Sequence, residues 1–487
     1  MSCAISQFYT TLLLALDRGD KPAVVTREEV FTYAQLRHTT GNIHSHLKRL
    51  SGQIVVTYTG KTLESYAAVL AALLSNVTWV PLSAAQPLHR NRHIVSSIKP
   101  ALLLYDSTIS SDLLEFVKRK DIQATHILET TVGGGELTLP RFEPDDVAYI
   151  MFTSGSSGQP KGVPMTHANY IPFIRNMLQL LPFGDNEVFS DFHDWAFDIS
   201  IFYLLCFPFV GGAIAPADDK ADRLIPLDYI DTLGITVWSS VPSAIGLIQR
   251  LRPSEEVDNK IRIMFLCGEP LPLSIVKYCF TNMNVPAVYN FYGLTETGVE
   301  NFYHECSPDD FDRFVNRGYA PIGIPLPGNK AKIDKNDELC LAGEQLMRGY
   351  LEGAKSSRFF VEGGIRWFRT GDRAEQQGSL FWCRGRLDTQ VKIRGYRVDL
   401  KDIEVNICQH AHIDEAVCFI DEDKQQRIIA AVVSKEEDID ANMILASIKD
   451  RLPDYMRPDQ IIVSKKSLPR NENGKLDRNA VIENWRK

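Results

Sequence analysis

The chain has 487 residues, of which 44% are hydrophobic and 23% are charged, so it resembles ordinary globular proteins and is too long for one hydrophobic core. Its 53 basic and 61 acidic side chains give a net charge of −8 without a basic stripe, which argues against nucleic acid as a partner. The nine cysteines stand singly, without a C-x-x-C pair, so the sequence predicts neither a zinc site nor a disulfide framework. This cysteine usage is typical of a cytoplasmic protein.

The N-terminus has no basic segment ahead of an apolar run, so no signal peptide is predicted. The most apolar window, SYAAVLAALLSNVTWVPL at residues 65–82, contains Ser75, Asn76 and Thr78 and is too short to cross a bilayer. We predict a buried helix that runs into a strand, and no membrane insertion.

Short apolar runs alternate with helical patterns through the first 380 residues, as in GQIVVTYTG, ALLLYD, DDVAYIMFTSG, GITVWSSVP and IRIMFLCGE. Such runs are typical of strands in a sheet that is covered on both faces, so this part is predicted to be a large α/β region.

A charged segment near residue 385 opens a different pattern. It predicts a strand over 391–400, a helix over 401–410, a hairpin of 415–423 with 427–435, a helix over 441–452 and a strand over 460–465. About 100 residues is the usual size of a domain. We therefore predict two domains, 1–387 and 388–487, with the boundary at Asp388 and a small α+β second domain.

The stretch TSGSSGQPKG, Thr153–Gly162, follows the apolar strand VAYIMF. Glycines let successive backbone N–H groups turn toward one anion, the hydroxyls add donors, and Lys161 adds a point charge suited to phosphate. The loop is not the G-x-x-x-x-G-K-[ST] phosphate loop, because Gln159 and Pro160 separate the last glycine from the lysine. The alternative is a surface turn.

Three later segments carry further candidates. In YNFYGLTETG at 289–298, Tyr292 suits a flat base, Thr295 a phosphate oxygen and Glu296 a Mg²⁺ ion, although a capped loop would look the same. At 368–388, Asp372 and Arg386 suit the hydroxyls of a ribose; the alternative is a salt-bridged loop. Finally, NENGKLDR at 471–478 presents Lys475 on an Asn-Gly turn, where a lysine is ordinarily just solvated.

In this order, the segments resemble the adenylate-forming superfamily, and within it the stand-alone amino-acid adenylation enzymes of the non-ribosomal peptide synthetase and D-alanine–carrier protein ligase type. The resemblance runs almost from end to end. It also includes FTYAQL (31–36), LAALLSNVTWVPLSAAQP (70–87), DELCLAGEQLMRGYL (337–351), RTGD (369–372) and GRLDTQVKIRGYRVDLKDIE (385–404).

The resemblance implies an α/β fold with layered sheets and helices in a large N-terminal adenylate-forming domain, plus a small mobile C-terminal α+β domain. It also implies a ligase with two half-reactions, using ATP and Mg²⁺. A carboxylate attacks the α-phosphorus of ATP and pyrophosphate leaves; a thiol then takes the acyl group. Because two anions meet in the first step, catalysis should rest on neutralised charge and alignment.

Carried over position by position, the resemblance assigns roles to residues from both domains. Glu296 would hold Mg²⁺, Lys475 would bridge the substrate carboxylate and the phosphate, and Asp388 would be the hinge. The β- and γ-phosphates would be held by Thr153, Ser154, Gly155, Ser156, Ser157, Gly158 and Lys161. Adenine and the α-phosphate would be surrounded by Asn290, Phe291, Tyr292, Gly293, Leu294 and Thr295, and the ribose held by Asp372, Cys383, Arg384, Gly385 and Arg386.

The segment HDWAFDISIFY, 193–203, separates amino-acid from acyl substrates. Asp198 matches the aspartate that binds the α-ammonium group in the family, and a buried carboxylate without a cation would be costly. The alternative is that Asp198 caps a helix. The resemblance places the substrate against Asp198, Ile199, Phe202, Ser239, Phe265, Cys267, Phe291, Val299, Glu300 and Lys475.

Three phenylalanines in this set would favour a small or flat side chain, whereas Glu300 would either pair with a basic side chain or point away. The stretch FLCGEPLP, 265–272, resembles D-alanine–carrier protein ligases, so D-alanine is one candidate substrate.

No carrier motif such as G-G-x-S occurs, so we expect a phosphopantetheinylated carrier protein that acts in trans, and a monomeric enzyme. Two other functions stay open: a carboxylate–CoA ligase, and a non-catalytic adenylate-binding module. The first would use CoA as acceptor. The second would have no chemical reason to keep Lys161, Glu296, Asp372 and Lys475 together.

Replacing Lys475 tests the assigned chemistry. Lys475→Ala should lower amino-acid-dependent ATP–pyrophosphate exchange by about 10²-fold or more, as expected when one charge contact in a transition state is lost. Near-normal exchange in this variant would contradict the role assigned to Lys475.

Overall fold

The computed structural model describes residues 2–153, 160–217, 220–351, 356–393, 395–421, 427–434, 436, 439–465, 467–470, 476 and 478–486. Its contacts divide the chain into two compact units. The large unit is 1–83, 98–152 and 162–387; the small unit is 84–97, 153–161 and 388–487. Among the described residues, no helix is both long and apolar enough to cross a membrane.

In the part of the chain that is described, the strands of the large unit form three sheets. In spatial order, the first sheet holds β15 (Ile324–Pro325), β14 (Phe302–Glu305), β13 (Ala287–Tyr292), β12 (Ile263–Leu266), β11 (Val237–Ser240), β9 (Val188–Asp191), β10 (Ala213–Pro216), β1 (Pro22–Val25) and β2 (Val30–Thr32). The second holds β6 (Gln123–His126), β5 (Leu102–Tyr105), β3 (Ile54–Tyr58), β4 (Thr78–Pro81), β7 (Val147–Thr153) and β8 (Lys161–Thr166). The third holds β16 (Asn329–Ile333), β17 (Glu338–Gly343), β19 (Ile365–Gln377) and β18 (Phe359–Glu362), with β20 (Leu380–Arg386) paired to β19.

The helices of the large unit are α1 (Ser2–Ala15), α2 (Tyr33–Leu47), α3 (Leu63–Leu74), α5 (Ser111–Arg119), α6 (His167–Leu180), α7 (Ser200–Val210), α8 (Lys220–Leu224), α9 (Pro226–Leu233), α10 (Pro242–Leu251), α11 (Leu273–Thr281) and α12 (Asp310–Arg313). Helix α3 is buried nearly throughout and leads into the buried strand β4, so the helix and strand predicted for residues 65–82 are confirmed.

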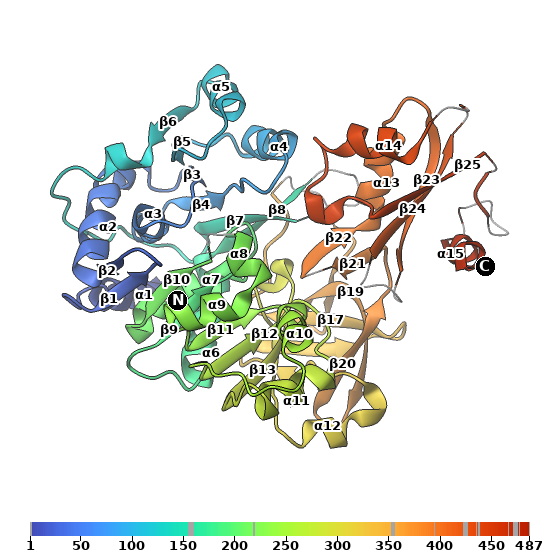
Figure 1. Ribbon diagram of the computed structural model, residues 1–487. Helices are drawn as coiled ribbons and strands as arrows, with labels where there is room; N and C mark the ends of the chain where they lie inside the picture. Colours follow the sequence, from blue (N-terminus) through green and yellow to red (C-terminus); the bar gives the residue numbers. More distant parts are fainter. Residues whose placement is uncertain are drawn as a thin grey trace. The chain divides into compact units, whose positions relative to one another are not determined.

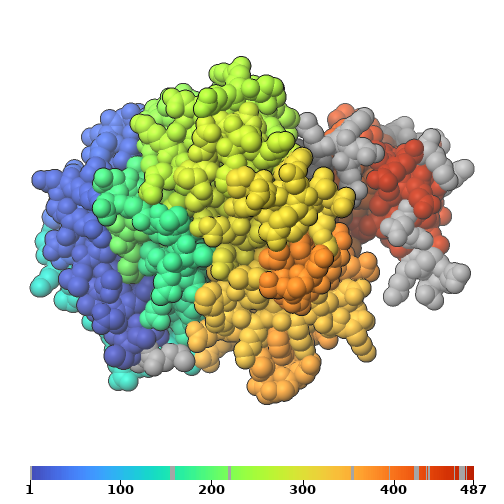
Figure 2. All heavy atoms as spheres, turned by 90° about the horizontal axis from the view of Figure 1, so that it is seen from below, coloured from blue at the N-terminus to red at the C-terminus, as the bar shows by residue number. Residues whose placement is uncertain are grey.

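The central strands of the first sheet run parallel and are covered on both faces, as the apolar runs predicted. Alternate residues face opposite ways: Phe265 belongs to the core under α6 and α7, and Met264 to the core under α9, α10 and α11 (Figure 1). Helix α1 packs against α6 and α7, and in Figure 2 the blue N-terminal residues lie against the green residues of 150–200. The first sheet is thus buried between two helical layers.

The small unit contains α13 (Leu400–Cys408), α14 (Ala441–Ile448) and α15 (Arg478–Arg486), together with α4 (Leu88–Ile98) as far as residue 97. Strands β23 (Ile413–Asp421), β24 (Arg427–Ser434) and β25 (Gln460–Ser464) form a sheet with α13 and α14 on one face and α15 on the other. The two helices, the hairpin and the final strand predicted for this part of the chain are confirmed as α13, α14, β23 with β24, and β25.

The single strand predicted over 391–400 is wrong. The segment forms a hairpin of β21 (Gln390–Ile393) with β22 (Tyr396–Asp399). Gly395 has φ 83°, a left-handed conformation that glycine adopts without steric cost, and this reverses the chain. Apolar residues alternate with polar ones on both sides of the turn, so the sequence pattern did not reveal that the chain reverses between two strands.

A buried polar network joins three helical segments of the large unit. The Tyr9 hydroxyl lies 2.7 Å from His167 Nδ1, and His167 Nε2 lies 2.8 Å from Asn76 Oδ1. Asn76 Nδ2 donates to Asp146 Oδ2, so Asn76 Oδ1 is the acceptor and His167 carries its hydrogen on Nε2. Burial lowers the pKa of His167 to about 4, which keeps the imidazole neutral.

Because the folded pKa of His167 lies below the ordinary 6.5, the unfolded chain binds more protons between pH 6.5 and about 4. The contribution of His167 to the free energy of unfolding is therefore fully present above pH 6.5. It is lost as the pH falls toward 4, which lowers the free energy of unfolding by about 3 kcal/mol. We expect His167→Gln to flatten the acid side of the pH–stability curve, measured by urea unfolding between pH 7.5 and 4.5. His38→Gln, at an exposed position of α2, should keep the wild-type slope. An unchanged slope in His167→Gln would contradict the account.

Candidate active site

The loop after β13 folds back on itself within a few residues. A Cβ at Gly293 would come within 2.0 Å of the Val299 carbonyl oxygen, so only glycine fits there. Gly298 and Val299 have φ of 85° and 67°. A positive φ is strained for a β-branched residue such as Val299, and strain of this kind clusters at functional sites. The loop is therefore held in one conformation by its surroundings.

Gln345, which follows β17, holds this loop from outside. Its Nε2 donates to the carbonyls of Gly298 and Glu300 at 2.7 and 2.8 Å, and its Oε1 accepts from Asn329 Nδ2 at 2.7 Å. The side chain is 1% exposed. The sequence reasoning quoted its motif but did not single out Gln345, because no spacing distinguishes a bracing glutamine from a solvated one.

Glu296, predicted to hold Mg²⁺, is the central residue of the short helix η3 (Thr295–Thr297) and is 1% exposed. Its Oε1 accepts from the Tyr350 hydroxyl at 2.9 Å, and its carbonyl accepts from Met347 N–H at 3.0 Å. Both donors come from the segment after β17. The predicted motifs at 289–298 and 337–351 therefore meet at Glu296.

Asp372, predicted to hold the ribose, lies on β19 directly opposite Arg386 on β20 and is 2% exposed. Its Oδ2 accepts from the Tyr292 hydroxyl at 2.5 Å and its Oδ1 from Arg386 Nη1 at 2.8 Å. Burial, reinforced by the charge of Asp372, raises the pKa of Tyr292 well above its ordinary value. The structure thus brings together Tyr292, Asp372 and Arg386.

The rest of the predicted ribose segment is more open. Cys383 is half-buried, Gly385 is exposed with φ 99°, and the exposed Arg384 pairs with Glu375 at 2.7 Å. Asp388 is exposed and is the first residue of the C-terminal segment of the small unit.

The chemistry of these groups fits the ligands predicted for them. A carboxylate oxygen can accept two hydrogen bonds, so the bonds from Tyr292 and Arg386 leave Asp372 with capacity for a diol. Glu296 offers the hard oxygen donor that Mg²⁺ prefers.

Asp198 lies one residue before Ile199, the N-cap of α7, and its carbonyl accepts from Ile201 N–H at 3.0 Å. The N-cap residue of α7 is Ile199, so the alternative that Asp198 is the N-cap of this helix is wrong. Its charge adds to burial in raising the pKa of Tyr149, whose hydroxyl is buried and makes no hydrogen bond to any described residue. Asp198 is half-buried, and its charge acts on the buried hydroxyl of Tyr149.

The three predicted phenylalanines form one stack. The rings of Phe202 and Phe265 lie 4.3 Å apart between centroids, and those of Phe265 and Phe291 lie 3.9 Å apart. Ser239 is the register partner of Phe265, and its buried Oγ has no hydrogen-bond partner among the described residues. Buried as well are Ile199, Cys267, Val299 and Glu300. We call Phe202, Phe265 and Phe291 the phenylalanine stack.

The predicted phosphate loop is described at its ends. β7 ends at Thr153 and β8 begins at Lys161, both half-buried. Gly162 accepts a hydrogen bond from Leu351 N–H at 3.0 Å, next to Tyr350. The predicted ligands Ser154, Gly155, Ser156, Ser157 and Gly158 lie outside the described residues, as does Lys475.

The sequence reasoning missed a buried ion pair beneath the segment that carries Asp198. Asp191 is fully buried and accepts from Lys61 Nζ at 2.8 Å, Tyr66 OH at 2.7 Å and Trp195 Nε1 at 2.8 Å. Burial, with a further effect of Lys61, lowers the pKa of His193 to about 3, so His193 is neutral. Lys61 follows β3 far away in the sequence, and nothing in its surroundings marks it.

The comparisons with known proteins agree with this architecture. Residues 15–351 match the AMP-binding enzyme family, and residues 402–475 match the AMP-binding enzyme C-terminal domain. The chain belongs to the AMP-binding enzyme family and is a ligase, as the resemblance of its motifs implied.

A D-alanine–D-alanyl carrier protein ligase of Staphylococcus epidermidis is 28% identical over 482 residues, which cover 96% of each chain. The Vibrio cholerae adenylation domain AlmE, in complex with glycyl-adenosine-5'-phosphate, gives a TM-score of 0.83 at 21% identity over 99% of this chain and 98% of that one. The o-succinylbenzoate CoA synthetase of Bacillus subtilis, bound to a product analogue, gives 0.83 at 22% identity over 97% and 98%. These structures confirm the predicted fold class.

Gln345→Ala should destabilise the large unit by about 2 to 3 kcal/mol, because three hydrogen bonds, two of them buried, are lost at about 1 kcal/mol each. Urea unfolding measures the loss. Gln376→Ala, an exposed glutamine on β19, should stay within about 0.5 kcal/mol of wild type. Equal stability of the two variants would show that Gln345 does not hold the loop.

Proposed function

We propose that this ligase activates an amino acid with ATP, releases pyrophosphate, and transfers the aminoacyl group to the phosphopantetheine thiol of a separate carrier protein. The observation that carries the proposal is the position of Asp198, two residues before the start of α7, the helix that contributes Phe202 to the phenylalanine stack, together with the effect of its charge on the buried hydroxyl of Tyr149. A carboxylate next to an apolar wall suits a substrate with an ammonium group at one end and a small side chain at the other.

In the first half-reaction, a carboxylate oxygen of the amino acid bonds to the α-phosphorus of ATP, and the bond from that phosphorus to the bridging oxygen of pyrophosphate breaks. Asp372 would hold the ribose, with Tyr292 and Arg386 fixing the orientation of its carboxylate. Glu296 would hold Mg²⁺, which supplies positive charge to the phosphates. Lys161 and the loop before it would bind the β- and γ-phosphates. Such fixed charges lower the barrier because they need no reorganisation during the reaction.

The small domain would supply Lys475 to the first half-reaction. A rotation about Asp388 would then withdraw Lys475 and bring the β21–β22 hairpin, with Gly395, toward the thiol channel. The thiolate of the carrier would attack the acyl carbon, and AMP would leave with the electron pair of the broken acyl–phosphate bond.

The substrate is proposed to be a small amino acid, with D-alanine as one candidate. The three stacked rings are bulky and buried, so as a wall of the substrate pocket they would leave little room for a long side chain. The D-alanine relative and the AlmE complex with a glycyl adenylate, both of small amino acids, support this size.

A carboxylate–CoA ligase is the second candidate, favoured by the fold shared with the o-succinylbenzoate CoA synthetase. The two functions differ in the acceptor thiol and in whether the substrate carries an ammonium group. A non-catalytic adenylate-binding module would bind nucleotide without releasing pyrophosphate.

Amino-acid-dependent ATP–pyrophosphate exchange tests the proposal across L-, D- and β-amino acids. Glycine or alanine should support exchange at least about 10²-fold better than propionate, which lacks the ammonium group that Asp198 would bind. Holo-carrier protein, and not CoA, should then accept the acyl group. Exchange with simple carboxylates alone would contradict the assignment of Asp198.

The Phe202→Ala variant tests the predicted size limit in the same assay. It should raise exchange with leucine relative to glycine by about tenfold or more, because space opens beside the remaining rings. The matched control is Phe209→Ala, since Phe209 lies on the same helix but packs against Phe8 at 4.8 Å. A leucine-to-glycine ratio that changes equally in both variants would mean that the phenylalanine stack does not set the substrate size.

A further inference from the structure

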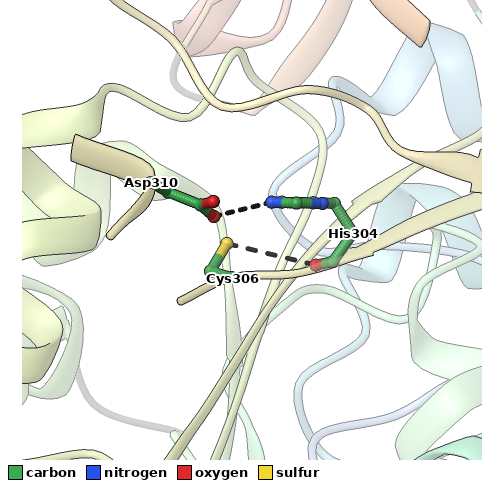
Figure 3. A group of neighbouring side chains, drawn as sticks. All are labelled: His304, Cys306 and Asp310. Atoms are coloured by element: carbon green, nitrogen blue, oxygen red, sulfur yellow. Dashed lines mark hydrogen bonds and ion pairs between the residues drawn. The ribbon is translucent and has the colours of Figure 1, made fainter. Parts of the chain in front are cut away.

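Three potential metal ligands converge on one side of the first sheet. His304 lies on β14, Cys306 follows the end of that strand, and Asp310 is the first residue of α12. Each offers one ligand atom, and these atoms all lie within 4.8 Å of one another (Figure 3). Cys306 and Asp310 are 6% and 1% exposed, and His304 is 9% exposed. We call these residues the β14–α12 cluster.

Part of the cluster is explained by local bracing. Asp310 Oδ2 lies 2.7 Å from His304 Nε2 and accepts from Ser307 N–H at 3.1 Å, which closes the turn between β14 and α12. Cys306 Sγ lies 4.0 Å from the His304 carbonyl, at the outer limit for a hydrogen bond to sulfur. These hydrogen bonds explain the positions of Asp310 Oδ2 and the His304 imidazole, but they leave Asp310 Oδ1 without a hydrogen bond among the described residues.

Two buried acceptors near the cluster are left without hydrogen bonds to any described residue: Asp310 Oδ1 and Asn290 Oδ1. Asn290 on β13 is the register partner of His304, so the two side chains leave the same face of the sheet. Arg313 Nη1 is 3.9 Å from Asp310 Oδ1, beyond hydrogen-bond distance, and its side chain is 61% exposed. A buried acceptor without a donor is costly and calls for a water or an ion.

We propose that His304, Cys306 and Asp310 bind a divalent transition-metal ion, with Zn²⁺ as the best match. Imidazole nitrogen, thiolate sulfur and carboxylate oxygen are the three ligand types that Zn²⁺ takes in proteins, and hard ions such as Mg²⁺ do not favour the sulfur. Ligand atoms around one tetrahedral ion are roughly 3 to 4 Å apart, so small movements complete the site. The fourth position would go to water or to Asn290 Oδ1.

Binding changes the protonation of two ligands. The ion needs the lone pair of His304 Nε2, so this nitrogen carries no hydrogen in the metal-bound form, while the Cys306 thiol releases its proton to solvent. The ion then replaces the hydrogen between His304 and Asp310. It would tie α12 to β14, and with Asn290 as the fourth ligand also to β13, the strand that ends at Tyr292. His304, Cys306 and Asp310 have no role in the proposed adenylation, so the site stands whether or not that function is correct.

Cobalt(II) titration of the intact, tag-free chain after treatment with a chelator tests the site. We expect one tightly bound Co²⁺ per chain with a thiolate-to-cobalt absorption band, its displacement by one equivalent of Zn²⁺, and a raised melting temperature of the metal-loaded chain. Cys306→Ala should lose the band and weaken binding at least tenfold. Cys340→Ala, which removes another buried thiol on β17, should keep both.

Asp310→Asn is the second variant, in case Cys306→Ala does not fold; circular dichroism checks the folding of both. A folded Asp310→Asn chain that binds Co²⁺ more weakly, with an altered band, would support the proposal. The proposal is overturned if wild type binds no ion, or if the folded variants bind Co²⁺ as wild type does. In the first case a water satisfies the two acceptors; in the second any bound metal lies elsewhere.

Discussion

The carboxylate of Asp372 sits at 2% exposure, and the surrounding structure has to provide hydrogen bonds in place of the water it has lost. Tyr292 provides one from the end of β13 and Arg386 provides the other from β20, while Asp372 itself lies on β19. One buried charge therefore joins the first sheet to the third. Removing either donor would leave a buried charge partly uncompensated, which is costlier than the loss of an ordinary surface contact.

The same arrangement recurs around Glu296 and the loop that follows it. Tyr350 and Gln345 both follow β17 and bind, respectively, the carboxylate of Glu296 and the carbonyls on either side of Val299. Gly293 allows the loop to close tightly enough for these contacts. Groups that are to stabilise charge on a phosphate need such fixed orientations, since reorganisation during the reaction would cost much of the benefit. At both positions, proposed to bind Mg²⁺ and ribose, the carboxylate is thus held by a hydroxyl or guanidinium donor from another segment of the large unit.

The buried strands and the loops that carry the candidate site residues could be predicted from the sequence, because both leave a local pattern in it. Apolar runs such as IRIMFLCGE predict strands buried on both faces, and the glycine, threonine and carboxylate motifs mark chain reversals that carry function. The segment VKIRGYRVDL misled because a hairpin keeps the apolar alternation of a strand, and only the left-handed Gly395 breaks it. The bracing residue Gln345 and the Lys61–Asp191 ion pair could not be predicted, because their partners are far away in the sequence. The spacing of the cysteines likewise predicted no zinc site. The β14–α12 cluster contains only one cysteine, and its third member, Asp310, comes close to the other two only because α12 folds back onto β14.

We propose that the loop before Lys161, together with Asp372 and Glu296, serves attack at the α-phosphorus rather than at the γ-phosphorus of ATP. The nucleotide product decides between them. Incubation of the chain with α-³²P-labelled ATP, Mg²⁺, glycine or alanine, and a holo-carrier protein should give labelled AMP, in amounts equal to the aminoacyl thioester formed. Labelled ADP in place of AMP would contradict the account.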